Sequence, residues 1–114
     1  MIARGVAAVV AGLASAGVPA TDNPSNVNPP GAYVQPRTLD GFTLGGSALL
    51  TVDVFLCAPA NNRDRVETIL ADLLDKALTV LDPAEPITLN ATLSLDVGTV
   101  PCYIIAATTE TERT

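Results

Sequence analysis

The feature that most constrains the fold is a stripe of large aliphatic residues in residues 61–82, NNRDRVETILADLLDKALTVLD. Spacings of three and four place the apolar residues on one face of a helix: Val66, Ile69, Leu70, Leu73, Leu74, Ala77, Leu78 and Leu81. The other face offers two i,i+4 ion pairs, Arg63 with Glu67 and Asp72 with Lys76. Asn61 or Asn62 is a suitable N-cap, and Pro83 ends the run. The stripe predicts a helix packed on a core; a coiled-coil seam is the minority interpretation because the pattern is short.

Residues 1–20, MIARGVAAVVAGLASAGVPA, allow two interpretations. A basic residue, Arg4, followed by an uncharged apolar run that ends in Ala14-Ser15-Ala16 is typical of an export signal. The large aliphatic residues nevertheless fall on one helical face: Ile2, Val6, Val9, Val10 and Leu13. Gly17 and Pro19 then supply a stop, as a folded helix requires. An export signal needs no stripe, so we expect a retained helix that packs on the core.

The next segment, residues 18–31, contains four prolines and three asparagines in VPATDNPSNVNPPG. This composition predicts neither a helix nor a central strand. The segment is either an ordered, turn-rich connection or an extended arm that binds a partner, and the sequence leaves both open.

Four further segments read as strands joined by turns. Residues 32–39 form a short strand in which Pro36 requires a sheet edge or a bulge, and a turn at 40–46 joins it to a long strand at 47–58. Residues 86–98 alternate, with one set expected to point inward: Ile87, Leu89, Ala91, Leu93 and Leu95. The closing strand, from residue 99 onward, has Val100, Cys102, Ile104 and Ala106 on one side and Tyr103 and Ile105 on the other.

The element order is therefore α-β-β-α-β-β within one domain, residues 1–114. We expect an α+β fold in which two helices pack on one face of an antiparallel-rich, four-stranded sheet.

The composition excludes several classes of chemistry. The chain has no His, which excludes His-based triads and the usual zinc sites. Six basic against twelve acidic residues give a net charge of −6, which is unsuited to gripping nucleic acid or an anionic membrane. Cys57 and Cys102 lie in apolar strand-like runs, so buried free thiols are favoured over a disulfide.

Carboxylates are the remaining catalytic candidates. Asp53, Asp72, Asp75 and Asp96 lie on separate elements, and nothing in their spacing brings two together. Asp53 lies mid-strand among apolar residues and would need Arg37 or another partner if that face were covered. Gly45-Gly46 opens a strand, which excludes a phosphate-binding loop. We expect no catalytic, cofactor-binding or metal-binding residues.

The whole chain resembles a known family in the order and amino-acid composition of its elements. The elements that carry the resemblance are an Ala/Val-rich first helix, a loop ending in NVNPPGAYVQP, a strand ALLTVDVFLCAP, a helix NNRDRVETILADLLD and a final two-stranded hairpin. Together they resemble the tail-terminator proteins of long-tailed actinobacterial phages, which are also called tail-completion or head-to-tail connector proteins. The resemblance implies a virion protein, assembled in the host cytoplasm, that forms a homohexameric ring on the tail tube and stops its growth. Its partners would be further copies of itself, the tail tube protein and a head-side connector protein. Genomic DNA would pass through the lumen without specific binding, and no membrane would be involved.

In such a ring, the loop at 18–31 and the turn at 40–46 would be natural interface elements. The interface residues that we predict from them are Asn26, Asn28, Pro29, Tyr33, Arg37, Asp40, Phe42 and Leu44. Three alternatives remain at this point: another neck ring protein, a secreted or envelope-associated binding domain with a Cys57–Cys102 bridge, and a carboxylate-only hydrolase centred on Asp53.

Overall fold

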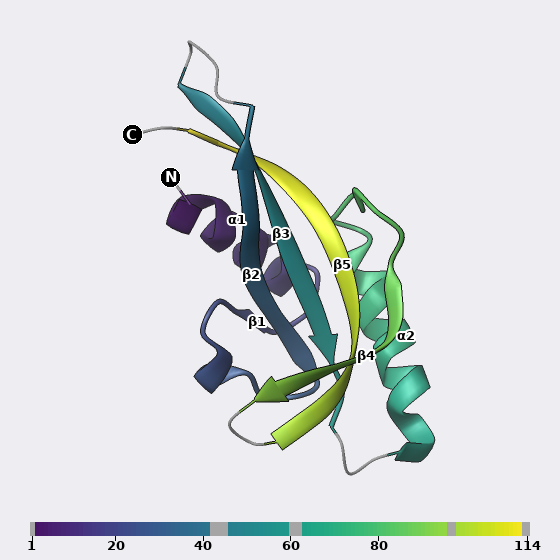
Figure 1. The fold of residues 1–114 in the computed structure, drawn as a ribbon. Helices are drawn as coiled ribbons and strands as arrows, with labels where there is room; N and C mark the ends of the chain where they lie inside the picture. The colour runs from purple at the N-terminus through teal and green to yellow at the C-terminus, as the bar shows by residue number, and fades with distance from the viewer. Residues whose placement is uncertain (1, 42–45, 60–62, 96–97, 113–114) are drawn as a thin grey trace.

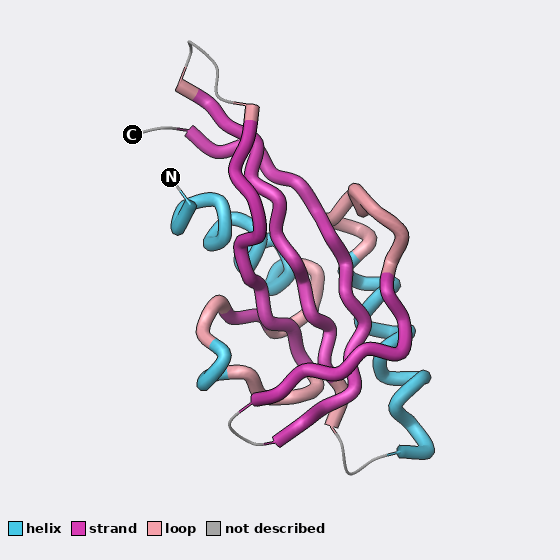
Figure 2. Tube along the Cα trace, viewed as in Figure 1, coloured by secondary structure: helices cyan, strands magenta, loops and turns pink. Residues whose placement is uncertain are grey.

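The computed structural model of the chain describes residues 2–41, 46–59, 63–95 and 98–112. Over these residues the fold is α+β, with two helices and one mixed, five-stranded sheet (Figure 1; Figure 2). The elements are α1 (Ile2–Ser15), β1 (Ala20–Thr21), β2 (Gly31–Asp40), β3 (Ser47–Cys57), α2 (Val66–Ala77), β4 (Thr88–Leu95) and β5 (Gly98–Glu112). Their order in the sheet is β1-β2-β3-β5-β4, and the β1–β2 pair is parallel while the others are antiparallel.

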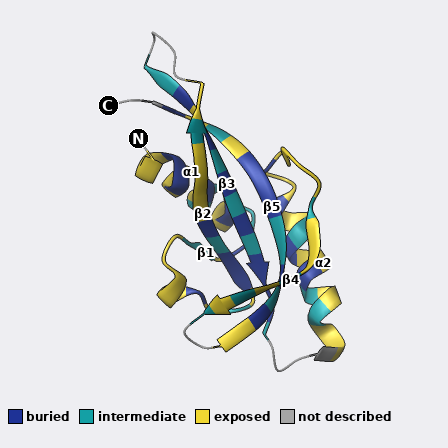
Figure 3. Ribbon diagram, in the orientation of Figure 1, coloured by how far each residue is buried: buried dark blue, intermediate teal, exposed yellow. Residues whose placement is uncertain are grey.

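Both helices pack on the same side of the sheet, which we call the helix face. One core cluster joins them to the strands: Val6, Val9 and Leu13 of α1, Leu70, Leu73 and Ala77 of α2, and Val34, Leu50, Val52, Val54, Leu56, Ile105 and Ala107 of the sheet. Most of each aliphatic stripe is thus confirmed as a core face, but Ile2 and Leu78, which the predicted stripes included, are 44% and 40% exposed. Figure 3 shows the buried residues running along β3 and the exposed ones on the outward side of α2.

Gly5 marks the closest approach of α1 to the sheet. This residue is buried, and a Cβ atom added to it would lie 2.5 Å from Cδ2 of Leu50, which is itself fully buried. Gly12, further along the same helix, has nothing within 4 Å of a Cβ at its position. Glycine therefore permits close packing at one end of α1.

The expected four-stranded sheet is wrong by one strand, because residues 18–31 contribute β1. Ala20 and Thr21 pair with Ala32 and Tyr33, and the amide N–H of Ala32 donates to the carbonyl of Pro19 at 2.7 Å. The segment packs as a connection rather than extending as an arm: Val18 and Val27 are both buried. Prolines exclude a central strand, but a two-residue edge strand between them needs only a few ladder hydrogen bonds.

Pro36 lies at a sheet edge and beside a bulge, as its ring requires. β1 covers β2 only at Ala32 and Tyr33, so Pro36 is at the outer edge of β2. The register shifts between Pro36 and Thr38, which makes Arg37 an extra residue opposite β3. Beyond this shift, Leu39 packs against the helix-face core.

The second helix is shorter than its apolar stripe. We expected a helix within residues 61–82, but α2 spans Val66–Ala77 after a single 3₁₀ turn, and turns follow to residue 80. Arg65 occupies the N-cap position without a side-chain hydrogen bond. The proposed caps Asn61 and Asn62 lie outside the described residues. Leu81 is nevertheless buried, because the turn after the helix returns it to the core.

β4 departs from the predicted alternation at a bulge. Thr88 pairs with Ile104 but Ala91 pairs with Cys102, so β4 holds one extra residue, and Asn90 there has a φ of 61°. Ile87 packs against the helix-face core, whereas Leu89 is 53% exposed, contrary to its expected inward position. The bulge therefore divides one alternating sequence between the two faces of the sheet.

A second, smaller cluster lies on the side of the sheet opposite the helices, which we call the outer face. The outer cluster consists of buried Val27, Cys57, Val100 and Cys102, with Tyr33, Phe55, Ala91, Leu93, Leu95 and Ile104 packed against them. In Figure 1 and Figure 2, β4 crosses in front of the sheet at this end. Val100, Cys102 and Ile104 thus share the outer face of β5, as the alternation of its sequence had predicted, while Ile105 lies on the helix face.

Candidate interaction surface

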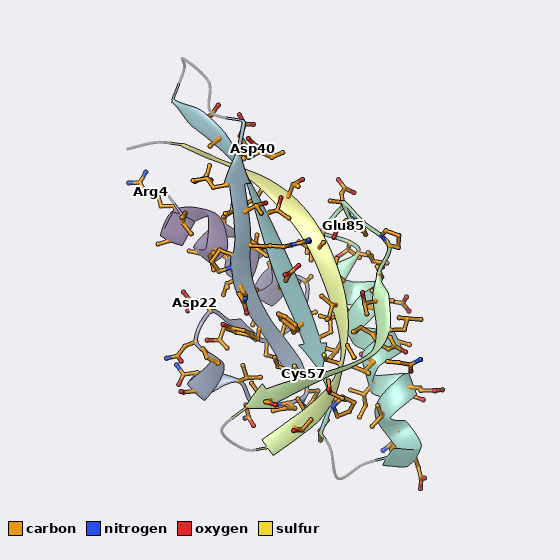
Figure 4. All side chains as sticks on the ribbon, viewed as in Figure 1. Arg4, Asp22, Asp40, Cys57 and Glu85 are labelled. Atoms are coloured by element: carbon orange, nitrogen blue, oxygen red, sulfur yellow. The ribbon has the colours of Figure 1, made fainter. Side chains whose placement is uncertain are left out.

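The predicted interface residues do not converge on a pocket but follow β2 from one end to the other. Asn26 and Asn28 are exposed beside the start of β2, and Asp40 is exposed at its far end, where Figure 4 labels it. Tyr33 and Arg37 lie between them. Phe42 and Leu44 are outside the described residues. The described members of the predicted set therefore form a band along β2.

At the start of this band, the connection before β2 is held by local hydrogen bonds. The side chain of Asn23 accepts from the backbone N–H of Ser25 at 3.0 Å and begins a 3₁₀ turn, Pro24–Asn26. Pro29 is half-buried and precedes Pro30 through a cis peptide bond. Val27 faces the outer cluster, so the exposed asparagines beside it are carried on an anchored segment.

Tyr33 is less available than an exposed interface residue would be. Its ring stacks on Phe55 of β3, with centroids 5.8 Å apart and the two planes inclined by 23°. Both side chains are partly buried against the outer cluster. Aromatic stacking of this kind stabilises the sheet itself, so the face of Tyr33 that stacks on Phe55 is not available to a neighbour.

Arg37 joins three segments on the outer face through two ion pairs. Its Nη2 lies 3.1 Å from Oδ1 of Asp53 on β3 and 2.8 Å from Oε2 of Glu85, and its Nη1 lies 3.4 Å from Oε1 of Glu85. Glu85 belongs to the segment before β4, which is tied to β5 by a hydrogen bond from Ala84 N to Ala106 O. Figure 4 labels Glu85 on the opposite side of the sheet from β2. Arg37, Asp53 and Glu85 therefore link β2, β3 and the segment before β4 across the outer face.

The pKa directions agree with this geometry. The hydrogen bonds from Arg37 hold the pKa of Glu85 below its ordinary value, and those to Glu85 raise the pKa of Arg37. Asp53 is paired with Arg37, the partner that the sequence had named among the possible ones. Glu85 was not anticipated, because no pattern in the sequence relates an acidic residue between two prolines to a strand 48 positions away.

The outer edge of β2 is open beyond Tyr33, but it is not a regular ladder. The backbone N–H of Ala32 points away from β3, toward β1. In an antiparallel pair the backbone groups of alternate residues point the same way, so the N–H of Val34 and the ring nitrogen of Pro36 also point away from β3. Pro36 has no N–H to offer there. Proline and the adjacent bulge protect such an edge from unselective strand pairing, so we expect contacts to this edge to be made by side chains.

Besides Ile2 and Leu89, the large exposed apolar side chains among the described residues lie at two places, the far end of the β2–β3 hairpin and the turn after α2. Leu49 is 45% exposed and pairs with Asp40 at the far end of the hairpin, whereas Leu78 and Val80 are 40% and 43% exposed in the turn after α2. In Figure 1, β2 and α2 lie toward opposite sides of the molecule, although Glu85, further along the segment after α2, reaches Arg37 of β2. Two separate, partly apolar surfaces are thus presented.

Two hollows border α2. One, of about 530 Å³, lies between the start of α2 and the β4–β5 hairpin, with Asp64, Glu67, Thr92 and Thr99 on its walls. The other, of about 400 Å³, separates α2 from the end of α1 and is lined mainly by apolar groups such as Pro19, Pro30 and Ile69.

The described part of the chain offers little other chemistry. Within it, no three Asp, Glu, Cys or His side chains gather as metal ligands. Neither of its helices is long and apolar enough to cross a membrane. Asp72 pairs with Lys76 at 3.1 Å on the exposed side of α2, and Asp53 is held by Arg37, so both act as solvated or paired charges. Asp96 lies outside the described residues.

No protein-family model, curated protein or solved structure matches this chain.

Proposed function

We propose that the chain is a structural virion protein that forms a hexameric ring at the head-proximal end of a phage tail tube, where it ends tube growth and joins the tail to the head connector. The order of its helices and strands resembles that of tail-terminator proteins, and the α+β fold is compatible with that resemblance. Another ring of the neck is the alternative within the same class.

The observation that carries the proposal is a pair of separate sites with exposed apolar side chains, one at the far end of β2 and one in the turn after α2. A ring is closed by a heterologous interface, in which two different surfaces of each subunit meet those of its two neighbours. The band along β2 that ends at Asp40 and Leu49 provides one such surface, and the turn bearing Leu78 and Val80 provides the other. Exposed apolar groups on a small chain favour association.

The charge of the chain is suited to a conduit for DNA. Six copies, each with a net charge of −6, carry a combined charge of about −36 before counterions bind. A negative lumen repels phosphates, so the genome can slide through it without being held.

A secreted binding domain is less compatible with the packing of α1. Cleavage after Ala16 would remove Val6, Val9 and Leu13, all of which are buried in the main core. Loss of three such side chains costs several kcal/mol in total. Mass measurement of the protein from its native source tests this alternative, which requires a chain that starts after residue 16.

Light scattering coupled to size-exclusion chromatography tests the ring. We expect six times the monomer mass for the chain alone or when it is bound to tail tubes, and electron microscopy should show tubes capped at one end. Val80→Asp places a charge on the proposed interface and should give monomers, whereas Leu89→Asp, at an exposed position on β4, should leave the ring intact. A chain that stays monomeric and never caps tubes refutes the proposal.

A further inference from the structure

Cys57 on β3 and Cys102 on β5 are direct neighbours across the sheet. They are Cα partners in the antiparallel register of the two strands. The next pair, Ala58 and Pro101, is joined by a hydrogen bond from Ala58 N to Pro101 O at 3.1 Å. Because hydrogen-bonded and non-hydrogen-bonded pairs alternate along an antiparallel ladder, the cysteines occupy a non-hydrogen-bonded pair, in which Cα atoms are about 4.5 Å apart and side chains are closest.

The surroundings of the two thiols are apolar and closed. Cys57 and Cys102 are 0% and 1% exposed in the outer cluster, where Ala91 of β4 pairs with Cys102. Figure 4 labels Cys57 where β4 crosses the sheet. Burial raises the pKa of Cys57 to about 12, with a smaller contribution from Cys102, and raises that of Cys102 to about 11. The Cys57 thiol also donates to the carbonyl of Phe55 at 3.5 Å.

These features exclude two common uses of a cysteine pair. A metal site needs further ligands, and within the described residues none gather around these sulfurs. A redox-catalytic pair needs one exposed thiolate of low pKa, which is the opposite of what the outer cluster provides. The chemistry that remains is a bond between the two sulfurs themselves, since Cα separations of 4.4–6.8 Å are typical of disulfides.

We propose that Cys57 and Cys102 are a disulfide-forming pair, closed by a peroxide oxidant into a covalent tie between β3 and β5. One thiol gives up its proton and attacks hydrogen peroxide as the thiolate, the O–O bond breaks, and a sulfenic acid and hydroxide form; the hydroxide takes up the released proton and becomes water. The second thiol then displaces water from the sulfenic sulfur as the S–S bond forms. In sum, two thiols lose two protons and two electrons, and one peroxide becomes two waters.

The fold determines when this reaction occurs. β4 lies over the cysteines, so peroxide must wait for a local opening of the β4–β5 hairpin. Once formed, the bond closes a loop that contains both α2 and β4. It therefore fixes the first part of β5, the second strand of the β4–β5 hairpin, to β3, and the reaction links the redox environment to the stability of this end of the sheet.

Intact-mass spectrometry of the full chain after exposure to hydrogen peroxide tests the proposal. The protein should lose about 2 Da, regain it on reduction with dithiothreitol, and yield a proteolytic fragment in which residues 57 and 102 are linked. Cys57→Ala and Cys102→Ala, each with one thiol, should not lose that mass.

Several results would overturn the proposal, and the wild-type chain alone can give each of them. These are an unchanged mass, increments of about 16 Da without the 2 Da loss, and disulfide-linked dimers in place of the internal bond. The outcome is independent of ring formation, because a monomer can form the same bond.

Discussion

Substitution of Gly5 by alanine tests how closely α1 packs on the sheet. The added Cβ would lie 2.5 Å from Leu50 Cδ2 and 3.5 Å from Thr111 Cβ, and Leu50 is too deeply buried to move away freely. Overpacking of this kind costs about 1–3 kcal/mol. Alanine in place of glycine within a helix returns up to about 1 kcal/mol. We therefore expect Gly5→Ala to lower the free energy of unfolding by about 0–2 kcal/mol.

Gly12→Ala is the matched control on the same helix. It receives the same gain in helix propensity, and nothing lies within 4 Å of its new Cβ, so we expect a higher free energy of unfolding. The difference between the two variants, about 1–3 kcal/mol, isolates the cost of the close contact. Urea unfolding followed by far-ultraviolet circular dichroism, at one protein concentration, measures both.

A third variant identifies the contacting atom. Leu50→Val removes Cδ2, so Gly5→Ala should be less harmful in that background than in the wild type. If Gly5→Ala stabilises the chain as much as Gly12→Ala does, α1 does not approach Leu50 as described, and the reasoning fails.

Three further predictions concern other parts of the molecule. Arg37 lowers the pKa of Glu85 from its ordinary value of 4.5, so the charged carboxylate stabilises the fold above that pH, and the stabilisation is lost as the pH falls through the lowered value. Glu85→Gln should therefore flatten the dependence of the unfolding free energy on pH in this acidic range, as measured by urea unfolding. An unchanged dependence on pH would contradict the ion pair. Leu56→Ala, at a fully buried site, should cost about 2–5 kcal/mol in chemical unfolding, whereas Leu89→Ala, at a site 53% exposed, should cost less than about 1 kcal/mol. The oxidised Cys57–Cys102 form closes a loop of about 45 residues and should unfold with about 4 kcal/mol more free energy than the reduced form, and equal denaturation midpoints would count against an unstrained bond.

The helix-face core was predictable because its signals are local. Val6, Val9 and Leu13 recur with helical period, and so do Leu70, Leu73 and Ala77. Each set identifies its buried side without knowledge of the rest of the chain. The ion pair of Asp53 with Arg37 was also accessible, because a carboxylate in the middle of an apolar strand requires a partner and the neighbouring strand carries one cation.

The outer face was less predictable because it depends on long-range pairing. Val27 joins the outer cluster from the proline-rich segment, and Leu93 and Leu95 join it from β4, but nothing local indicates that these residues meet. The two-residue strand β1 is too short to have a periodic signal. Of the predicted interface residues, the described ones follow β2, but whether they contact a neighbouring subunit depends on assembly and stays a prediction.

The bulge in β4 has a consequence for tolerance to changes in chain length. Without the extra residue, Thr88 would still oppose Ile104 and Ala91 would still oppose Cys102, with Leu89 alone between them and the ladder unbroken. Deletion of Asn90 therefore leaves every other side chain of β4 on its present face. In β2 the extra residue is Arg37, and its deletion would remove the cation that spans the outer face. We therefore expect the fold to tolerate deletion of Asn90 and to be destabilised by deletion of Arg37.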